Sequence, residues 1–124
     1  MVKVRQGDIC WVRFGPPKDS GPSGKRPAVV VQNDLLNKSN IQTTVVALIT
    51  SNRKLAQVPG NILLKKGAAN LPKTSVVVVS QMATIDKSRL LEKIGTLKCE
   101  LQKEVIEGCR WVISVFGDVH NLES

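Results

Sequence analysis

The sequence predicts a mainly β fold with one C-terminal helix (α+β), in which five or six antiparallel strands form a strongly curved sheet or small barrel. Two observations predict it. Short β-branched segments separated by turn formers fill the chain as far as Leu97, which is typical of strands. Helical spacing of apolar residues begins only at Leu101, so no helix alternates with the strands and a parallel βαβ sheet is not expected.

The first half of the sheet is predicted from alternation and from turn residues. Residues 8–14 alternate with a period of two, which is typical of a strand. Residues 15–27 are so rich in Gly, Pro and Ser that we expect a mobile loop there rather than a helix or a strand. A buried strand over 28–31 follows directly and ends at the turn formers Asn33 and Asp34.

Three further strands are expected in the middle of the chain. β-branched residues predict a strand over 43–50, after which the polar and basic residues 51–57 form a second mobile loop. Residues 61–65 form a short strand and 67–72 a turn. The continuous Val run within 75–80 predicts a strand that is buried on both faces.

The last elements are a helical turn, a strand and a helix. A cap at Thr84 or Asp86 predicts one or two helical turns over 86–91, and 94–97 forms a final strand. No internal repeat and no linker divides the chain, so we expect one domain over residues 1–124. The apolar side of the helix is expected to consist of Leu101, Val105, Cys109, Val112, Ile113 and Phe116.

The charge is the strongest global property of the sequence. In its 124 residues, 18 Lys and Arg against 10 Asp and Glu give a formal net charge of +8, which would attract phosphate backbones or acidic proteins. The same charge could instead serve solubility alone. Residues 1–10 hold no continuous apolar segment, and no run approaches the ~20 apolar residues of a membrane span, so we expect no membrane association and a cytoplasmic location.

The titratable residues argue against several catalytic classes. The acidic residues never recur as DxD, DxxE or HxE, which disfavours a metal-dependent nuclease. His120 is the sole histidine, which excludes a two-histidine mechanism within one chain, and in the C-terminal tail it is poorly placed to serve a cysteine nucleophile. Cys10, Cys99 and Cys109 lack paired spacing, so we expect reduced, buried thiols rather than disulfides or a zinc site.

What remains is a chemistry of cations and hydroxyl groups, with neither a metal nor an organic cofactor. RNA suits such a chemistry, because the substrate supplies its own nucleophile, the 2′-hydroxyl group. The enzyme then aligns that oxygen and stabilises the extra negative charge on a five-coordinate phosphorus. An arginine fork beside a hydroxyl donor is suited to this task.

Four segments of the chain form a more specific pattern. Residues 24–34 read Gly-Lys-Arg-Pro-Ala-Val-Val-Val-Gln-Asn-Asp. This segment resembles the signature Gly-x-Arg-Pro-x-x-Val/Ile-Val/Ile-Gln-Asn-Asp of the MazF/PemK toxins. Residues 6–12 resemble that family's opening strand, 45–50 its strand that ends in a catalytic threonine, and 80–90 its Gln-x-x-Thr-Ile/Leu-Asp-x-x-Arg-Leu segment. The four segments occur in the family's order.

The resemblance implies an SH3-like, strongly curved sheet of the kind shared by MazF, CcdB and Kid, and a two-fold homodimer. It implies sequence-specific cleavage of single-stranded RNA that leaves a 2′,3′-cyclic phosphate. Arg26 would stabilise the phosphorus in the transition state and could also shuttle a proton, and Thr50 would hydrogen-bond the scissile phosphate. A small antitoxin with an acidic C-terminal segment would inhibit the enzyme. From the residues alone, Arg26 could also be a solvated loop charge and Thr50 a strand-end cap.

All the predicted RNA-binding residues except Gln81 lie in or beside the two basic loops. Phe14 is the candidate for base stacking, whereas Trp11 and Trp111 are expected in the core. Gln81, just past a buried strand, is either a base-contacting residue or an ordinary strand-end amide. The full set is Phe14, Lys18, Lys25, Ser51, Arg53 and Gln81.

Two departures from the family pattern leave questions open. No acidic residue lies shortly before Arg26, and Asp19 is the nearest candidate for a general base. Ala83 stands where many members have Arg, so a phosphate or base contact made there would be missing or would be supplied by Lys87 or Arg89. Two rival functions remain: a CcdB-type toxin that poisons DNA gyrase without chemistry, and a catalytically silent SH3-like nucleic-acid-binding module.

Overall fold

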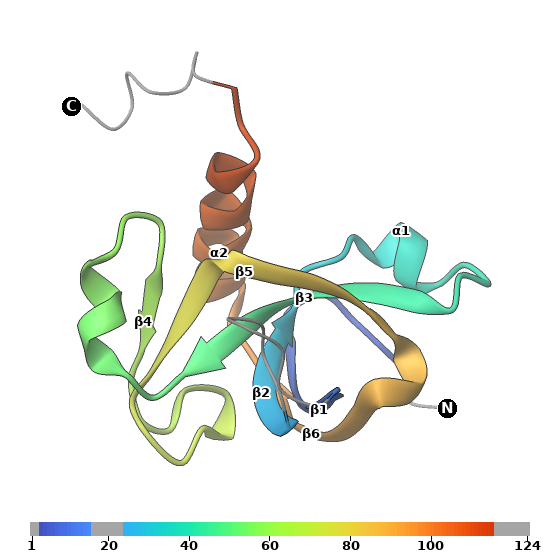
Figure 1. Ribbon diagram of the computed structural model, residues 1–124, viewed down its shortest axis with the longest axis horizontal. Coiled ribbons are helices and arrows are strands. Elements are labelled where there is room, and N and C mark those ends of the chain that lie inside the picture. The colour runs from blue at the N-terminus through green and yellow to red at the C-terminus, as the bar shows by residue number, and fades with distance from the viewer. Residues whose placement is uncertain (1–2, 16–23, 116–124) are drawn as a thin grey trace.

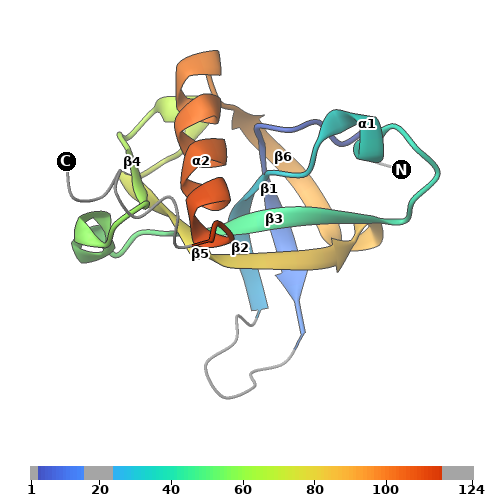
Figure 2. The same ribbon diagram turned by 90° about the horizontal axis from the view of Figure 1, so that it is seen from above.

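The computed structural model describes residues 3–15 and 24–115. In this part of the chain, six antiparallel strands form one sheet in the order β4-β5-β3-β2-β1-β6. The sheet curls so strongly that β1 and β2 run across β3 and β5 (Figures 1 and 2). The predicted curved antiparallel sheet with a C-terminal helix is confirmed. The strands are β1 (Asp8–Phe14), β2 (Gly24–Val30), β3 (Thr43–Thr50), β4 (Ile62–Leu64), β5 (Ser75–Asp86) and β6 (Leu90–Thr96).

Helices connect the strands and cover one side of the sheet. The α-helices are α1 (Asp34–Asn37) and α2 (Cys99–Val112), and the short 3-10 helices are η1 (Arg53–Gln57), η2 (Ala68–Asn70) and η3 (Lys87–Arg89). No helix in the described ranges is long and apolar enough to span a membrane.

A bulge in β5 divides the sheet into two halves. Between Ala47 and Leu48 of β3, the pairing skips residues 79–81 of β5. Such an insertion bends a strand and increases its twist, and Figure 1 shows β5 turning sharply beside α2. Asn61 fills the gap in the ladder, because its Oδ1 accepts a hydrogen bond of 3.1 Å from the backbone N of Val79.

The curled sheet is buried on both faces. Alternate residues of β1, β2 and β3 point to two separate apolar clusters. Burial on both faces is why β3 and the first half of β5 contain continuous apolar runs. The first cluster includes Ile9, Val29 and Ala47 together with Val105 and Cys109 of α2. The second includes Cys10, Ala28 and Val46 together with Ile85 and Leu90.

Helix α2 approaches the sheet through a glycine. A Cβ atom at Gly108 would lie 2.5 Å from the backbone O of Gly60, so only glycine permits this approach. The prediction that the apolar side of the helix extends to Ile113 is wrong. The helix stops at Val112 and Ile113 is 76% exposed, because its backbone has left the helical course that would return it to the sheet. Phe116 lies outside the described residues.

The loop predicted over 15–27 is wrong at its C-terminal end, because β2 already begins at Gly24. The composition of this stretch disfavours a strand, but β1 pairs with it residue by residue and overrides the propensity. Pro27 is tolerated because β3 pairs with β2 only from Ala28 onward, which leaves an open edge beside Pro27. Arg26 therefore lies on a strand and not in a loop.

Two other predicted turns or loops contain short helices. Asn33 caps α1, since its Oδ1 accepts a hydrogen bond of 2.8 Å from the backbone N of Leu35. The prediction of a mobile loop over 51–57 is also wrong, because residues 53–57 form η1. Asn61 anchors η1 by donating a hydrogen bond of 2.9 Å from Nδ2 to the backbone O of Leu55.

β5 and β6 are both longer than predicted. β6 begins at Leu90, where one or two helical turns were expected. Asp86 does cap a short helix, η3, as predicted, because its Oδ1 accepts a hydrogen bond of 2.8 Å from the backbone N of Ser88. Pairing with β1 takes over at Leu90 and ends this helix. Gln81 consequently lies inside β5, at the bulge, and not past the end of a strand.

Candidate active site

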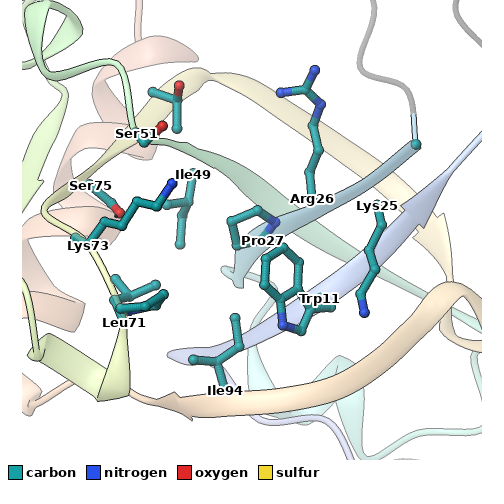
Figure 3. A pocket seen from close by; sticks show the side chains of 13 residues that line it. Trp11, Lys25, Arg26, Pro27, Ile49, Ser51, Leu71, Lys73, Ser75 and Ile94 are labelled. Carbon is teal, nitrogen blue, oxygen red and sulfur yellow. Dashed lines mark hydrogen bonds between the residues drawn. The ribbon is translucent and has the colours of Figure 1, made fainter.

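One concave pocket of about 380 Å³ brings together residues from several strands. It lies where β3 ends and β5 begins, and where the first residues of β2 pass next to β1 and β6 (Figure 3). Its lining includes Arg26 and Thr50, which the sequence predicts as the catalytic pair. It also includes Lys25 and Ser51, which are predicted RNA contacts.

The hydroxyl groups of the pocket come from the facing ends of β3 and β5. Thr50 is the last residue of β3, and its Oγ1 accepts a hydrogen bond of 3.2 Å from the backbone N of Asn52. Ser75 begins β5 and donates from Oγ to the backbone O of Lys73 at 2.9 Å. This bond orders the turn before β5. Figure 3 shows the Lys73 side chain directed into the pocket, beside Ser75 and Ile49.

The start of β2 contributes cationic side chains. Lys25 and Arg26 are both exposed, and both line the pocket. The Nζ of Lys25 lies 5.1 Å from the centroid of the Trp11 ring and 4.0 Å from Oε1 of Glu92. The exposed ion pair with Glu92 adds little, so the cation–π contact is the better-defined restraint on Lys25. The Arg26 guanidinium stands at the rim in Figure 3.

The opposite side of the pocket is apolar. Its lining includes Trp11 from β1, Ile94 from β6 and Leu71 from the turn before β5. Ile94 is the inserted residue of a bulge in the β1–β6 pairing, and a bulge re-aims side chains. Asn70 supports this bulge by donating from Nδ2 to the backbone O of Ile94 at 3.3 Å. The core position predicted for Trp11 is wrong, because this side chain is half-buried and lines the pocket.

The chemistry of the lining favours an anion. Among the lining residues within 3–15 and 24–115, none is acidic and none is histidine. Over the same ranges, no group of three or more His, Cys, Asp or Glu residues is arranged to hold a metal ion. Charge-assisted hydrogen bonds from several donors can stabilise phosphate oxygens. The donors available here are Lys25, Arg26, Lys73, Thr50, Ser51 and Ser75.

The other predicted RNA-binding residues are not brought to this pocket. Phe14 is half-buried and packs against the second apolar cluster. Arg53 lies on η1 and Gln81 on β5, and both are exposed away from the lining. Lys18 and Asp19 lie outside the described residues, so their predicted roles stay predictions.

Lys87 and Arg89, which could supply the contact that an arginine at position 83 would make, are both hydrogen-bonded to the backbone. Lys87 is buried, with 8% exposure, and donates from Nζ to the backbone O of Asn37 at 3.0 Å. That bond supports the end of α1, so the prediction that Lys87 supplies an RNA contact is wrong. Arg89 is exposed and donates from its guanidinium to the backbone O of Arg13 at 3.2 Å.

The two buried cysteines are not suited to nucleophilic catalysis. Burial raises the pKa of the Cys10 thiol and that of the Cys109 thiol to about 11. Both groups are therefore protonated at neutral pH, whereas the thiolate is the nucleophilic form. The expectation that all three thiols are buried is wrong for Cys99, which is exposed at the start of α2.

Sequence reasoning missed Trp11, Leu71, Lys73 and Ile94 as pocket residues. For Trp11 a signal was present, because strand alternation places it with Arg13 on the face opposite to the buried Cys10 and Val12. For Ile94 and Lys73 the sequence carries no comparable signal. A strand bulge aims the first and the geometry of a turn aims the second.

Curated relatives match the chain over most of its length. The model of the PemK-like, MazF-like toxins of type II toxin-antitoxin systems matches residues 5–113. Endoribonuclease MazF2 of Mycobacterium bovis is 38% identical over 112 residues, which cover 90% of this chain and 98% of the relative. Endoribonuclease MazF6 of Mycobacterium tuberculosis is similar to the same extent.

Solved structures share the fold. MazF from Deinococcus radiodurans superposes with a TM-score of 0.75 at 22% identity, covering 93% of this chain and 100% of the other. A mycobacterial endoribonuclease in complex with its cognate antitoxin superposes with a TM-score of 0.70 at 15% identity, covering 91% and 95%. Together with the family match over residues 5–113, the curled sheet and its pocket lead to one conclusion: the chain belongs to the PemK-like, MazF-like toxins of type II toxin-antitoxin systems.

Proposed function

We propose that this toxin is an endoribonuclease that cleaves single-stranded RNA at specific sequences in the pocket around Arg26 and Thr50. The observation that carries the proposal is the composition of the pocket, whose described lining combines three cationic and three hydroxyl-bearing side chains and holds no acidic residue. Glu92, which pairs with Lys25, lies outside the lining. The names of the relatives, Endoribonuclease MazF2 and MazF6, support the same activity.

The proposed reaction is an internal transesterification. The 2′-oxygen of a ribose forms a bond to the adjacent phosphorus and loses its proton, while the bond from phosphorus to the 5′-oxygen breaks and that oxygen gains a proton. The products are a 2′,3′-cyclic phosphate and a 5′-hydroxyl group. Arg26 stabilises the charge that develops on the phosphate oxygens, and the Thr50 hydroxyl donates to one of them.

The proposed mechanism needs neither a metal nor an organic cofactor. The guanidinium of Arg26 and the ammonium of Lys73 supply the positive charge that a divalent cation supplies in metal-dependent nucleases. The described lining contains no carboxylate or imidazole that could act as a general base.

We also propose that the toxin is a cytoplasmic homodimer that is inhibited by a small antitoxin with an acidic C-terminal segment. The net charge of +8 suits an acidic peptide. A mycobacterial endoribonuclease with the same fold is described in complex with its cognate antitoxin. Val112 and Ile113 at the end of α2 are exposed apolar side chains that a second subunit would bury.

The test is cleavage of a long single-stranded RNA in the presence of EDTA by the wild type, by Arg26→Ala and by Arg110→Ala. Arg110 is a matched control, because it is exposed on α2 and does not line the pocket. We expect discrete cuts by the wild type and the control, and a rate about 10²- to 10³-fold lower for Arg26→Ala. Intact RNA with the wild type would favour a gyrase poison or a silent binding module, and full activity of Arg26→Ala would place catalysis elsewhere.

A further inference from the structure

We infer that the pocket also contains a subsite for one nucleobase, in which the indole ring of Trp11 is the stacking surface. The inference rests on the proposed function, because the ligand is a nucleotide of single-stranded RNA beside the scissile phosphate. It adds a residue that recognises the substrate to those that stabilise the reacting phosphate.

The pocket has a polar end and an apolar end, as a nucleotide has a phosphate and a base. Figure 3 shows Arg26 and Ser51 toward one end of the pocket, and Trp11, Leu71 and Ile94 toward the other. The first end offers charge and hydrogen-bond donors, as a phosphate requires. The second end offers apolar surface with one large aromatic ring, as a base requires. The volume of about 380 Å³ falls within the range of roughly 300–1,000 Å³ for small-molecule sites.

The Trp11 ring is held in place and keeps one side toward the pocket. Lys25 lies 5.1 Å from the ring centroid and, in Figure 3, on the side of the ring away from Leu71. The strand pairing sets Trp11 opposite Pro27, so a rigid neighbour supports its backbone. A base entering the pocket would therefore meet an oriented indole across from Leu71, with little ordering of the ring required on binding.

The burial pattern of β1 argues that Trp11 does more than fill the core. Its neighbours Cys10 and Val12 are 2% and 0% exposed, whereas Trp11 is only half-buried although it is the largest side chain of the strand. An aromatic side chain at the wall of a cationic pocket is the arrangement with which proteins stack single-stranded bases. Loss of such stacking lowers affinity by about 10- to 100-fold.

The first test uses Trp11→Leu and Trp11→Phe with a short RNA that contains one mapped cut site, and with versions that carry an abasic ribose at each position flanking the cut. Trp11→Leu should raise KM by about 10-fold or more and change kcat less, while Trp11→Phe should keep most of the affinity. In the wild type, an abasic ribose at one of these positions should raise KM about as much as Trp11→Leu does. In Trp11→Leu, the same abasic ribose should raise KM little further. Losses that add in full, or wild-type cleavage that is indifferent to every abasic position, would overturn the inference.

A binding measurement separates this inference from the proposed reaction. The chain has two tryptophans, so Trp111→Phe leaves Trp11 as the only indole fluorophore. Titration with the same oligonucleotide carrying a 2′-O-methyl group at the cut should quench Trp11, and the abasic version should not. Quenching without any RNA cleavage would support the base subsite at Trp11 and contradict the proposed endonuclease activity. Cleavage without quenching would support the endonuclease activity and contradict the base subsite.

Discussion

Arg26 on β2 and Lys73 in the turn before β5 line one pocket from two sides; in Figure 3 the Lys73 side chain points into the pocket and the Arg26 guanidinium stands at its rim. Lys73→Gln should lower the cleavage rate by about 10²-fold, because it removes one of the two charges that stabilise the reacting phosphate. Lys66→Gln is the matched control, since Lys66 is exposed and outside the lining. Equal rates for the two variants would show that Lys73 acts only through the net charge.

Thr50 can be tested apart from its place at the end of β3. The residue lines the pocket, and its Oγ1 accepts a hydrogen bond from the backbone N of Asn52. Thr50→Val keeps the shape but loses the donor to phosphate, so we expect cleavage to fall by about 10- to 10²-fold. Thr50→Ser should restore most of the rate. If Thr50→Val loses activity only in proportion to its loss of folded protein in a urea titration, the hydroxyl is a strand-end cap alone.

For Gly108→Ala, helix propensity and packing act on the free energy of unfolding in opposite directions. In an exposed helix, Gly→Ala stabilises by about 1 kcal/mol. Here the new Cβ would meet the backbone O of Gly60 at 2.5 Å, so we expect Gly108→Ala to lower the free energy of unfolding by about 1–3 kcal/mol. Lys103→Ala, at an exposed position of the same helix, should be near neutral. Stabilisation by Gly108→Ala in denaturant titrations would contradict the close approach.

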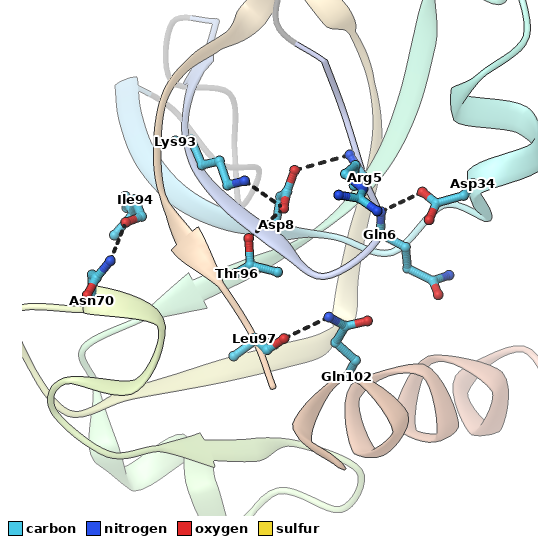
Figure 4. Close-up of polar contacts among 10 residues, drawn as sticks. All are labelled: Arg5, Gln6, Asp8, Asp34, Asn70, Lys93, Ile94, Thr96, Leu97 and Gln102. Carbon is cyan, nitrogen blue, oxygen red and sulfur yellow. Dashed lines mark hydrogen bonds and ion pairs between the residues drawn. The ribbon is translucent and has the colours of Figure 1, made fainter. Parts of the chain in front are cut away.

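Asp34 links stability to pH. The backbone N of Gln6 donates to Asp34 Oδ1 at 2.7 Å, and this bond is the main reason why the pKa of the carboxyl lies below its ordinary value of 3.8 (Figure 4). The stabilisation is present when the carboxyl is ionised, above about pH 5, and is lost as the pH falls through the lowered pKa. Asp34→Asn should therefore be less stable at pH 7, by less than about 1 kcal/mol because the group is partly exposed. In urea titrations the difference should shrink as the pH falls below 3.8 and through the lowered pKa, and a difference that stays constant would exclude ionisation as its cause.

The family signature predicted both the site and the fold because its residues divide between them. Arg26 and Pro27 line the pocket. Gln32, Asn33 and Asp34 instead hold the chain together around α1: Gln32 Nε2 donates to Asn37 Oδ1 at 2.9 Å, Asn33 caps the helix, and Asp34 accepts from Gln6. One segment of sequence therefore contributes both pocket residues and contacts that order the chain around α1.

The bounds of a strand or helix could be predicted from the sequence where the local residue pattern and the tertiary pairing favour the same structure. They agree in β1 and β3, whose predicted bounds match the structure, and in the body of α2. They disagree at residues 24–27, where Gly and Pro oppose a strand that pairing with β1 imposes. They also disagree at 81–86, where β5 continues past the bulge, and beyond the strand predicted over 75–80, because residues 82–86 pair with β3.

The same distinction applies to the pocket. Arg26 and Thr50 were predicted by resemblance, since their neighbours along the chain are distinctive. Lys73 and Ile94 were not, because a turn and a bulge direct them to a place that no spacing in the sequence encodes. Phe14 was chosen over Trp11 for base stacking, but alternation along β1 turns Phe14 toward the second apolar cluster and Trp11 toward the pocket.

The most direct test of the proposed reaction is cleavage of two RNA oligonucleotides that differ in a single atom. One contains the mapped cut site, and the other has 2′-deoxyribose only at the nucleotide on the 5′ side of the cut. The account predicts that the wild type converts the first into a fragment with a 2′,3′-cyclic phosphate in the presence of EDTA and leaves the second intact. A cut at the same position in the deoxy-substituted oligonucleotide would mean that water or another group attacks the phosphorus, and would contradict the 2′-hydroxyl as the nucleophile.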